Sequence, residues 1–147
     1  MRYRYLLIAA AVVIACGISR PASAIMPFYN QFKKDYLDNH SDKKFVEEVT
    51  GGQFKCLICH QGTKSKKNKN AFGMEVGKLL DKKKDAKDTA KISAELKKAL
   101  AMHVDPKDDK SETYLDRIKA GKWPAGNLDD LKKEPKDSQE SEGDEKK

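Results

Sequence analysis

The sequence predicts an all-α fold, and two patterns in its apolar residues support this prediction. Aromatic and aliphatic side chains recur at intervals of three or four along most of the chain, which places them on one face of a helix. No stretch alternates apolar and polar residues for long enough to indicate a strand. The 107 residues from Ile25 to Leu131 suffice for one modest hydrophobic core, so we expect a single domain.

Two helices are expected before the first pair of glycines. Phe28, Phe32 and Tyr36 recur at intervals of four and form the apolar stripe of the first helix. The second helix should lie between a polar capping residue and a glycine pair that stops it. Its defining residues are Ser41 or Asp42 as the cap, then Phe45, Val46, Val49 and Gly51-Gly52.

Three more helices are expected further along the chain. The third carries Phe72, Val76, Leu79 and Leu80, the fourth Ile92, Leu96, Ala99 and Leu100, and the fifth Tyr114, Leu115 and Ile118. The fourth should begin near Asp88 or Thr89, and the fifth should span about 111–120. Several small helices with a single tryptophan make a thin core, which a large apolar prosthetic group would fill.

The N-terminus predicts a secretory signal peptide over residues 1–24. Arg2 and Arg4 precede an unbroken apolar run from Leu6 to Cys16, and small residues follow at Ala22-Ser23-Ala24. The run is shorter than the roughly 20 residues that a spanning helix needs. Cleavage after Ala24 would release a mature chain, beginning at Ile25, to the periplasm or the cell exterior.

A second interpretation of the N-terminus is lipidation. Val13-Ile14-Ala15-Cys16 resembles the lipobox of bacterial lipoproteins, in which Cys16 would carry lipid. An acylated Cys16 would tether the protein to a membrane surface. We favour the soluble form, and expect association with a membrane only if Cys16 is lipidated.

The C-terminal segment from Lys132 to Lys147 contains no apolar residue, so we expect it to be a disordered tail. The full chain has a formal charge of +7, and without the three arginines of the signal peptide the charge is +4. Nucleic-acid binding is disfavoured, because the protein is expected to be exported and has few arginines or interleaved aromatic residues.

The chemistry of the chain is concentrated in Cys56-Leu57-Ile58-Cys59-His60, a C-x-x-C-H sequence typical of covalent haem c attachment. Two thiols three residues apart on a tight turn can add to the two vinyl groups of one porphyrin. The adjacent imidazole is then held over the iron as an axial ligand. Cys56 and Cys59 are the only cysteines left after cleavage, so they are not part of a disulfide framework.

Two other kinds of site share this spacing. A thioredoxin-like dithiol needs a βαβ context, and the sequence shows none. A structural zinc site needs four ligands, and only His40 or His103 remains to complete Cys56, Cys59 and His60.

With its attachment motif at Cys56–His60, the chain resembles the monohaem c-type cytochromes and, in its order of helices, the class I cytochrome c fold. The resemblance implies one haem c bound through Cys56 and Cys59, proximal ligation by His60, and an electron carrier without catalytic residues. It also implies a small helical domain built around the haem. Two family features are missing after the motif: a proline whose carbonyl holds the proximal imidazole, and a distal Met-Pro pair.

The sixth ligand of the iron is expected from a small set of residues. Met102 ranks first, because it lies at the end of the fourth helix and 42 residues beyond His60. His103 ranks second and an open site third. Met74 lies about 200° around the third helix from Phe72, so it should be a surface residue. Methionine ligation suits a carrier, whereas an open iron would indicate a haem-based sensor or a peroxidase-like protein.

Four lysines directly follow the motif: Lys64, Lys66, Lys67 and Lys69. Around an exposed haem edge they would attract a redox partner protein with an acidic docking surface. The alternative is a solvated loop that contributes only to solubility.

Overall fold

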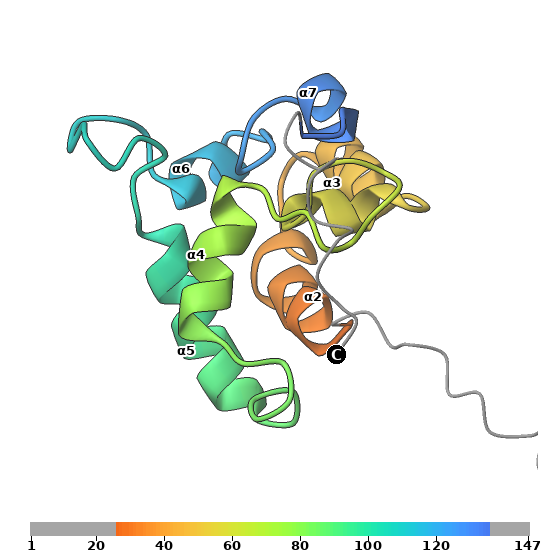
Figure 1. The fold of residues 1–147 in the computed structure, drawn as a ribbon. Coiled ribbons are helices and arrows are strands. Elements are labelled where there is room, and N and C mark those ends of the chain that lie inside the picture. Colours follow the sequence, from red (N-terminus) through yellow and green to blue (C-terminus); the bar gives the residue numbers. More distant parts are fainter. Residues whose placement is uncertain (1–25, 136–147) are drawn as a thin grey trace, which may run out of the picture.

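The structure, a computed structural model, describes residues 26–135. These residues form six α-helices, a π-helical turn and a 3-10 turn, with no strand among them (Figure 1). The elements in chain order are α2 (Met26–Phe32), η1 (Lys33–Leu37), α3 (Lys43–Thr50), η2 (Phe54–Ile58), α4 (Ala71–Leu79), α5 (Thr89–Leu100), α6 (Tyr114–Lys119) and α7 (Leu128–Lys132). The predicted all-α class is confirmed for this part of the chain.

Five helices begin at a polar side chain that accepts a hydrogen bond from the first helical turn. These N-caps are Asp42 for α3, Asn70 for α4, Asp88 for α5, Thr113 for α6 and Asn127 for α7. Each one satisfies a backbone N–H that has no partner within its own helix. Of the two predicted caps Ser41 and Asp42, Asp42 is the one observed, and the predicted start of the fourth helix near Asp88 or Thr89 is confirmed.

The hydrophobic core is formed by the apolar faces that the sequence predicts. Helix α5 packs against both α2 and α4, and α4 and α5 run side by side in Figure 1. Aromatic rings connect the layers: Phe32 of α2 lies 6.1 Å from Phe72 of α4, which lies 5.2 Å from Tyr114 of α6. Such tilted ring pairs bury large apolar surfaces and add a favourable contact energy of their own.

Two features of the fold were not predicted. The first helix widens after Phe32 into the π-helical turn η1, which buries Leu37. Helix α7 buries Leu131 and packs against η2, the turn that contains Cys56 and ends just before Cys59. Lys132 lies over the ring of Phe54, 5.0 Å from its centroid.

The end of α7 falls within the segment that composition predicts as a tail. Lys132 closes the helix, and Glu134 accepts hydrogen bonds from the loop after η2. Residues 132–135 are therefore ordered against the domain. Residues 136–147 lie outside the described residues, as do residues 1–24 with Cys16, so the predictions for those segments stay predictions.

Within residues 26–135, no helix is long and apolar enough to cross a membrane.

Candidate functional site

The C-x-x-C-H residues lie on a tight turn. Cys56 belongs to the 3-10 turn η2, and its carbonyl accepts hydrogen bonds from the N–H groups of Cys59, at 3.2 Å, and His60, at 2.9 Å. Both cysteines are free thiols, so each is available for a covalent bond. The turn brings the three predicted site residues together.

Asn70, the N-cap of α4, holds this turn in place. It is buried, and its Nδ2 donates to the carbonyls of Leu57 at 2.8 Å, Ile58 at 3.1 Å and His60 at 3.2 Å. Its Oδ1 accepts from the N–H of Gly73 at 2.8 Å. One side chain therefore satisfies three carbonyls of the motif and starts the helix that covers it.

Gly73 allows α4 to approach the motif closely. A Cβ at this position would lie 2.7 Å from the carbonyl carbon of Cys59 and still closer to its oxygen. Because these are backbone atoms, they cannot move aside as a flexible side chain would. The absence of a side chain at Gly73 is therefore required for the observed contact.

The imidazole of His60 is oriented by the loop that follows it. Its Nδ1 lies 3.1 Å from the carbonyl oxygen of Asn68, and because a carbonyl only accepts, Nδ1 carries the proton. The lone pair of Nε2 is then free to bind a metal, and the Asn68 contact fixes the tautomer and ring orientation. Asn68 thus provides a carbonyl partner for the imidazole in a chain that has no proline between His60 and Pro106.

The electrostatic surroundings keep this imidazole neutral. Burial lowers the pKa of His60, the Asn68 carbonyl partly offsets this, and the charges of Lys66 and Lys69 lower the pKa further. A neutral imidazole is the form that binds a metal.

Glu134 fixes the loop that contains Asn68. Its carboxylate accepts hydrogen bonds from the N–H groups of Thr63 at 2.8 Å and Lys64 at 2.9 Å, and from Nδ2 of Asn68 at 3.3 Å. The hydrogen bonds from Lys64 and Thr63 hold the pKa of this carboxyl below its usual value, so it stays ionised at neutral pH. The C-terminal end of the described chain therefore supports the orientation of His60.

A cavity of about 590 Å³ opens beside the motif. Cys56, Cys59 and His60 all line it, and its apolar walls include Phe28, Phe32, Ile58, Val76, Leu80 and Leu96. Its volume falls within the range of roughly 300–1,000 Å³ that is usual for small-molecule and cofactor sites. The cavity can therefore accept a large, mainly apolar group next to Cys56, Cys59 and His60.

The Cys59 thiol is not suited to attack a disulfide. Burial raises the pKa of the Cys59 thiol to about 12, and the neighbouring Cys56 also raises it, against a smaller lowering by Lys69. Reactive dithiols instead need a lowered thiol pKa. In addition, no group of three or more His, Cys, Asp or Glu residues in the described range is placed to hold a metal ion. A zinc site at this turn is therefore disfavoured as well.

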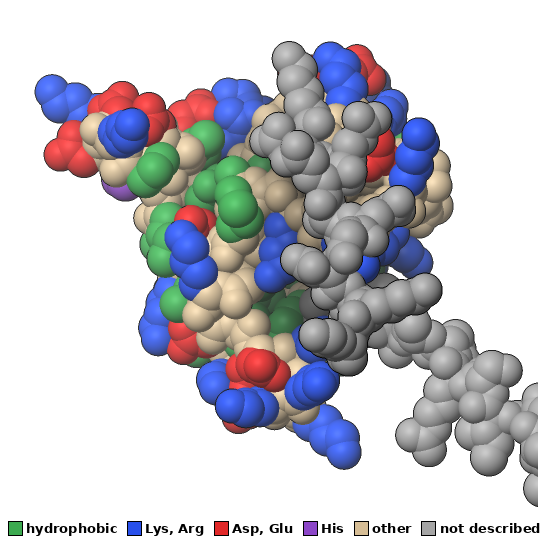
Figure 2. Space-filling view, in the orientation of Figure 1, with side chains coloured by type: hydrophobic (Ala, Val, Ile, Leu, Met, Phe, Trp, Pro, Cys, Tyr) green, Lys and Arg blue, Asp and Glu red, His purple; other side chains and the backbone are tan. Residues whose placement is uncertain are grey.

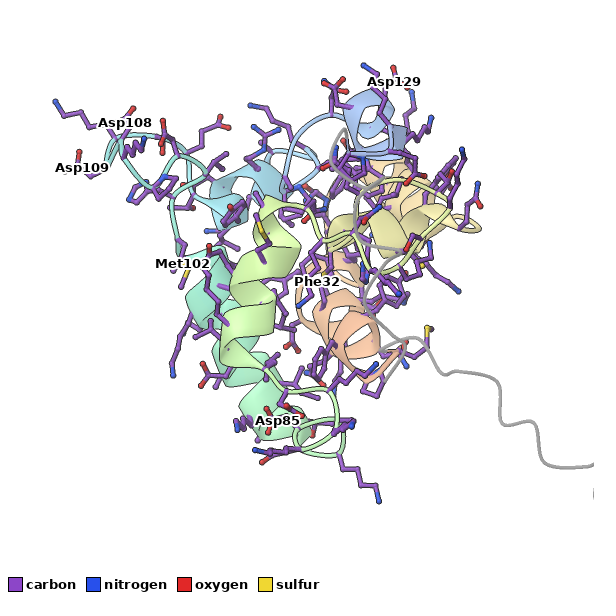
Figure 3. The ribbon with its side chains drawn as sticks, in the orientation of Figure 1. Phe32, Asp85, Met102, Asp108, Asp109 and Asp129 are labelled. Atoms are coloured by element: carbon purple, nitrogen blue, oxygen red, sulfur yellow. The ribbon has the colours of Figure 1, made fainter. Side chains whose placement is uncertain are left out.

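The expected distal ligands lie away from the cavity. Met102 and His103 do not line it, and Figure 3 shows Met102 beyond α5, on the side away from Phe32. The imidazole Nδ1 of His103 donates to the carbonyl of Ser111 at 2.6 Å. Met74 is 51% exposed, as predicted for a surface residue.

His40 is also committed elsewhere. It is buried, its Nε2 donates to the carbonyl of Ile118 at 2.7 Å, and its Nδ1 accepts from the N–H of Asp42. Both ring nitrogens are therefore occupied by structural hydrogen bonds.

Three of the four lysines after the motif, Lys66, Lys67 and Lys69, line the cavity. Lys55 and Lys82 add two more positive charges to its lining, whereas Lys64 contributes its backbone N–H to Glu134. Lysine side chains are spread over the face shown in Figure 2, while acidic side chains gather on the extension that carries Asp108 and Asp109 (Figure 3).

Sequence reasoning missed Asn70, Gly73, Asn68 and Met26. The sequence contains a local pattern that indicates two of them: Asn70 is a residue type that caps helices, and Gly73 follows three residues later. Met26 lines the cavity but precedes the motif, and only methionines after the motif were considered.

Comparison of the chain with protein-family models, curated proteins and solved structures finds no match. The assignment of the site therefore rests on its own residues.

Proposed function

We propose that this protein is an exported monohaem c-type cytochrome that carries electrons between partner proteins. The observation that carries the proposal is the position of the C-x-x-C-H turn. Two free cysteines and His60 line one cavity with largely apolar walls, and the hydrogen bond of the His60 ring uses Nδ1 rather than Nε2. Export is proposed from residues 1–24, with a tether through Cys16 as the alternative.

The residues present fit a covalently attached haem. Cys56 and Cys59 would form the thioether bonds, and His60 would be the proximal ligand through Nε2. The apolar walls would surround the porphyrin, and the lysines that line the cavity could pair with its carboxylates. When bound, haem supplies a one-electron iron couple, while the chain shields the iron and tunes its potential.

The first prediction is that the polypeptide acquires covalent haem. Protein produced together with haem-maturation machinery should remain coloured on a denaturing gel stained for haem, because thioether bonds survive unfolding. The visible spectrum should be low-spin in both oxidation states. Colourless protein that contains zinc would refute the proposal, and a high-spin spectrum would instead support a haem-based sensor or peroxidase-like protein.

A matched pair of variants tests where the haem is attached. Replacing both Cys56 and Cys59 by alanine should abolish the stain. Replacing Met74 and Ser93, which do not line the cavity, should leave the stain unchanged.

The second prediction concerns the lysines at the cavity. Oxidation of the reduced protein by the anionic reagent ferricyanide should slow as salt rises, because the screening length falls to about 8 Å at physiological ionic strength. Replacing Lys66, Lys67 and Lys69 by glutamine should flatten this dependence. Stopped-flow absorbance measures the rate, and a cationic cobalt oxidant should show the opposite trend.

The control for this experiment removes the same charge elsewhere. Lys107, Lys110 and Lys119 lie on the α5–α6 connection and on α6 and do not line the cavity. Their replacement by glutamine should preserve the salt dependence. If the oxidation rate depended on salt equally in both triple variants, the cavity lysines would contribute to solubility alone.

A further inference from the structure

Helix α2 places a thioether at the cavity that contains the motif. Met26 is the first residue of α2, is partly buried, and lines the same cavity as Cys56, Cys59 and His60. Two turns of α2 anchor this position, because Phe28 and Phe32 are buried in the core and also line the cavity. The sulfur-bearing side chain is therefore held at the cavity by the packing of its helix.

The cavity lining offers one imidazole and one thioether, the pair of ligands that suits an electron-carrying haem. Among the described residues that line it, His60 and Met26 are the only histidine and methionine. The other histidines and methionines between residues 26 and 135 lie elsewhere: His40, Met74, Met102 and His103. His40 and His103 make the hydrogen bonds described above, and Met74 is exposed.

Met102 would need a rearrangement to reach the cavity. It follows α5, where its N–H donates to the carbonyl of Ala99 and its own carbonyl accepts from the N–H of Tyr114. Its side chain packs against the core, outside the cavity lining. Ligation by Met102 would therefore have to break contacts that connect α5 to α6, whereas Met26 already lines the cavity.

We infer that Met26 is the second axial ligand of the haem iron. The inference rests on the proposed function, since it requires a haem attached at Cys56 and Cys59. A thioether is a soft donor that stabilises reduced iron and raises the reduction potential. An iron ligated by His60 and Met26 has no open position, which suits electron transfer and disfavours binding of gases or peroxide.

The test compares single alanine substitutions at the three methionines of the described chain. In the oxidised wild-type protein, thioether ligation should give a weak sulfur-to-iron absorption band in the far red. Met26→Ala should lose this band, lower the reduction potential and allow the reduced protein to bind carbon monoxide. Met74→Ala and Met102→Ala should retain the band, the potential and the resistance to carbon monoxide.

Three controls separate failure of this inference from failure of the proposed function. Met26→Ala should still stain for haem, because Cys56 and Cys59 are intact. Met26→His should remain low-spin with a lowered potential, which a purely structural role of Met26 would not explain. Loss of the band in Met102→Ala but not in Met26→Ala, or a wild-type protein without the band, would overturn the inference and leave covalent haem standing.

Discussion

Replacing Gly73 by alanine should lower the free energy of unfolding by about 3 kcal/mol and sharply reduce the fraction of protein that carries haem. The added Cβ would overlap the carbonyl group of Cys59, where the nearest atoms belong to the backbone of the motif. Either α4 or the C-x-x-C-H turn has to move. Overpacking of this kind typically costs about 1–3 kcal/mol, and the upper end applies because no side chain can yield.

Helix propensity predicts the opposite change in stability, so the two effects can be distinguished by the sign of the measured change. Alanine is favoured over glycine in a helix interior by up to about 1 kcal/mol, so propensity alone predicts a stabilised variant. Gly77, one turn later in α4, provides the matched control. A Cβ there would meet only the Nζ end of the flexible Lys69 side chain. Gly77→Ala should therefore be neutral or slightly stabilising.

Chemical denaturation and the haem-to-protein absorbance ratio measure both effects of the glycine variants. For a domain of this size, 3 kcal/mol corresponds to a fall in Tm of roughly 10 °C. Equal stability of Gly73→Ala and Gly77→Ala would show that α4 does not press against the motif.

The helices were predictable because their signals are local. The apolar stripe of α5, with Ile92, Leu96, Ala99 and Leu100, is buried as its spacing predicts. The cap at Asp42 and the stop at Gly51 place α3 within a residue or two of its observed bounds. The adjacency of Cys56, Cys59 and His60 follows from their positions in the sequence.

The support of the site was not predictable, because it depends on contacts between distant segments. Glu134 accepts hydrogen bonds from the N–H groups of Thr63 and Lys64, which lie 70 or more residues earlier in the chain. The segment that contains Glu134 has the composition of a tail. Met102 ranks first by its place at a helix end and its distance along the chain from His60, and neither signal shows which residues line the cavity. The side of the cavity formed by α2, including Met26, depends on packing of α2 against α5.

The second large effect is expected from Asn70→Asp, a change of almost no volume. The buried Nδ2 donates to three carbonyl oxygens, and a carboxylate oxygen in its place would face them without a proton. Breaking a buried polar network in a way that leaves an unpaired charge costs about 3–5 kcal/mol. Asn70→Ala loses the hydrogen bonds without adding a charge, so it should cost less, about 2 kcal/mol.

The pH dependence identifies the charge as the cause of this loss. Burial near carbonyl oxygens raises the pKa of an aspartate in the folded state above its unfolded value of about 3.9. Between these two pKa values the folded state binds more protons than the unfolded state, so stability falls as pH rises. Asn70→Asp should therefore be least stable at neutral pH and should recover toward pH 4 relative to wild type, whereas the deficit of Asn70→Ala should stay nearly constant.

Asn127→Asp serves as the control for helix capping. Asn127 caps α7 with the same contact, its Oδ1 accepting from the N–H of Asp130 at 2.9 Å, but it is exposed. Aspartate is as good an N-cap as asparagine, so this variant should lose less than about 1 kcal/mol despite its acidic neighbours. Denaturant titrations of the three variants from pH 4 to pH 8 make the comparison. If Asn70→Asp were as stable as Asn127→Asp at neutral pH, Asn70 would not be the residue that holds the C-x-x-C-H turn on α4.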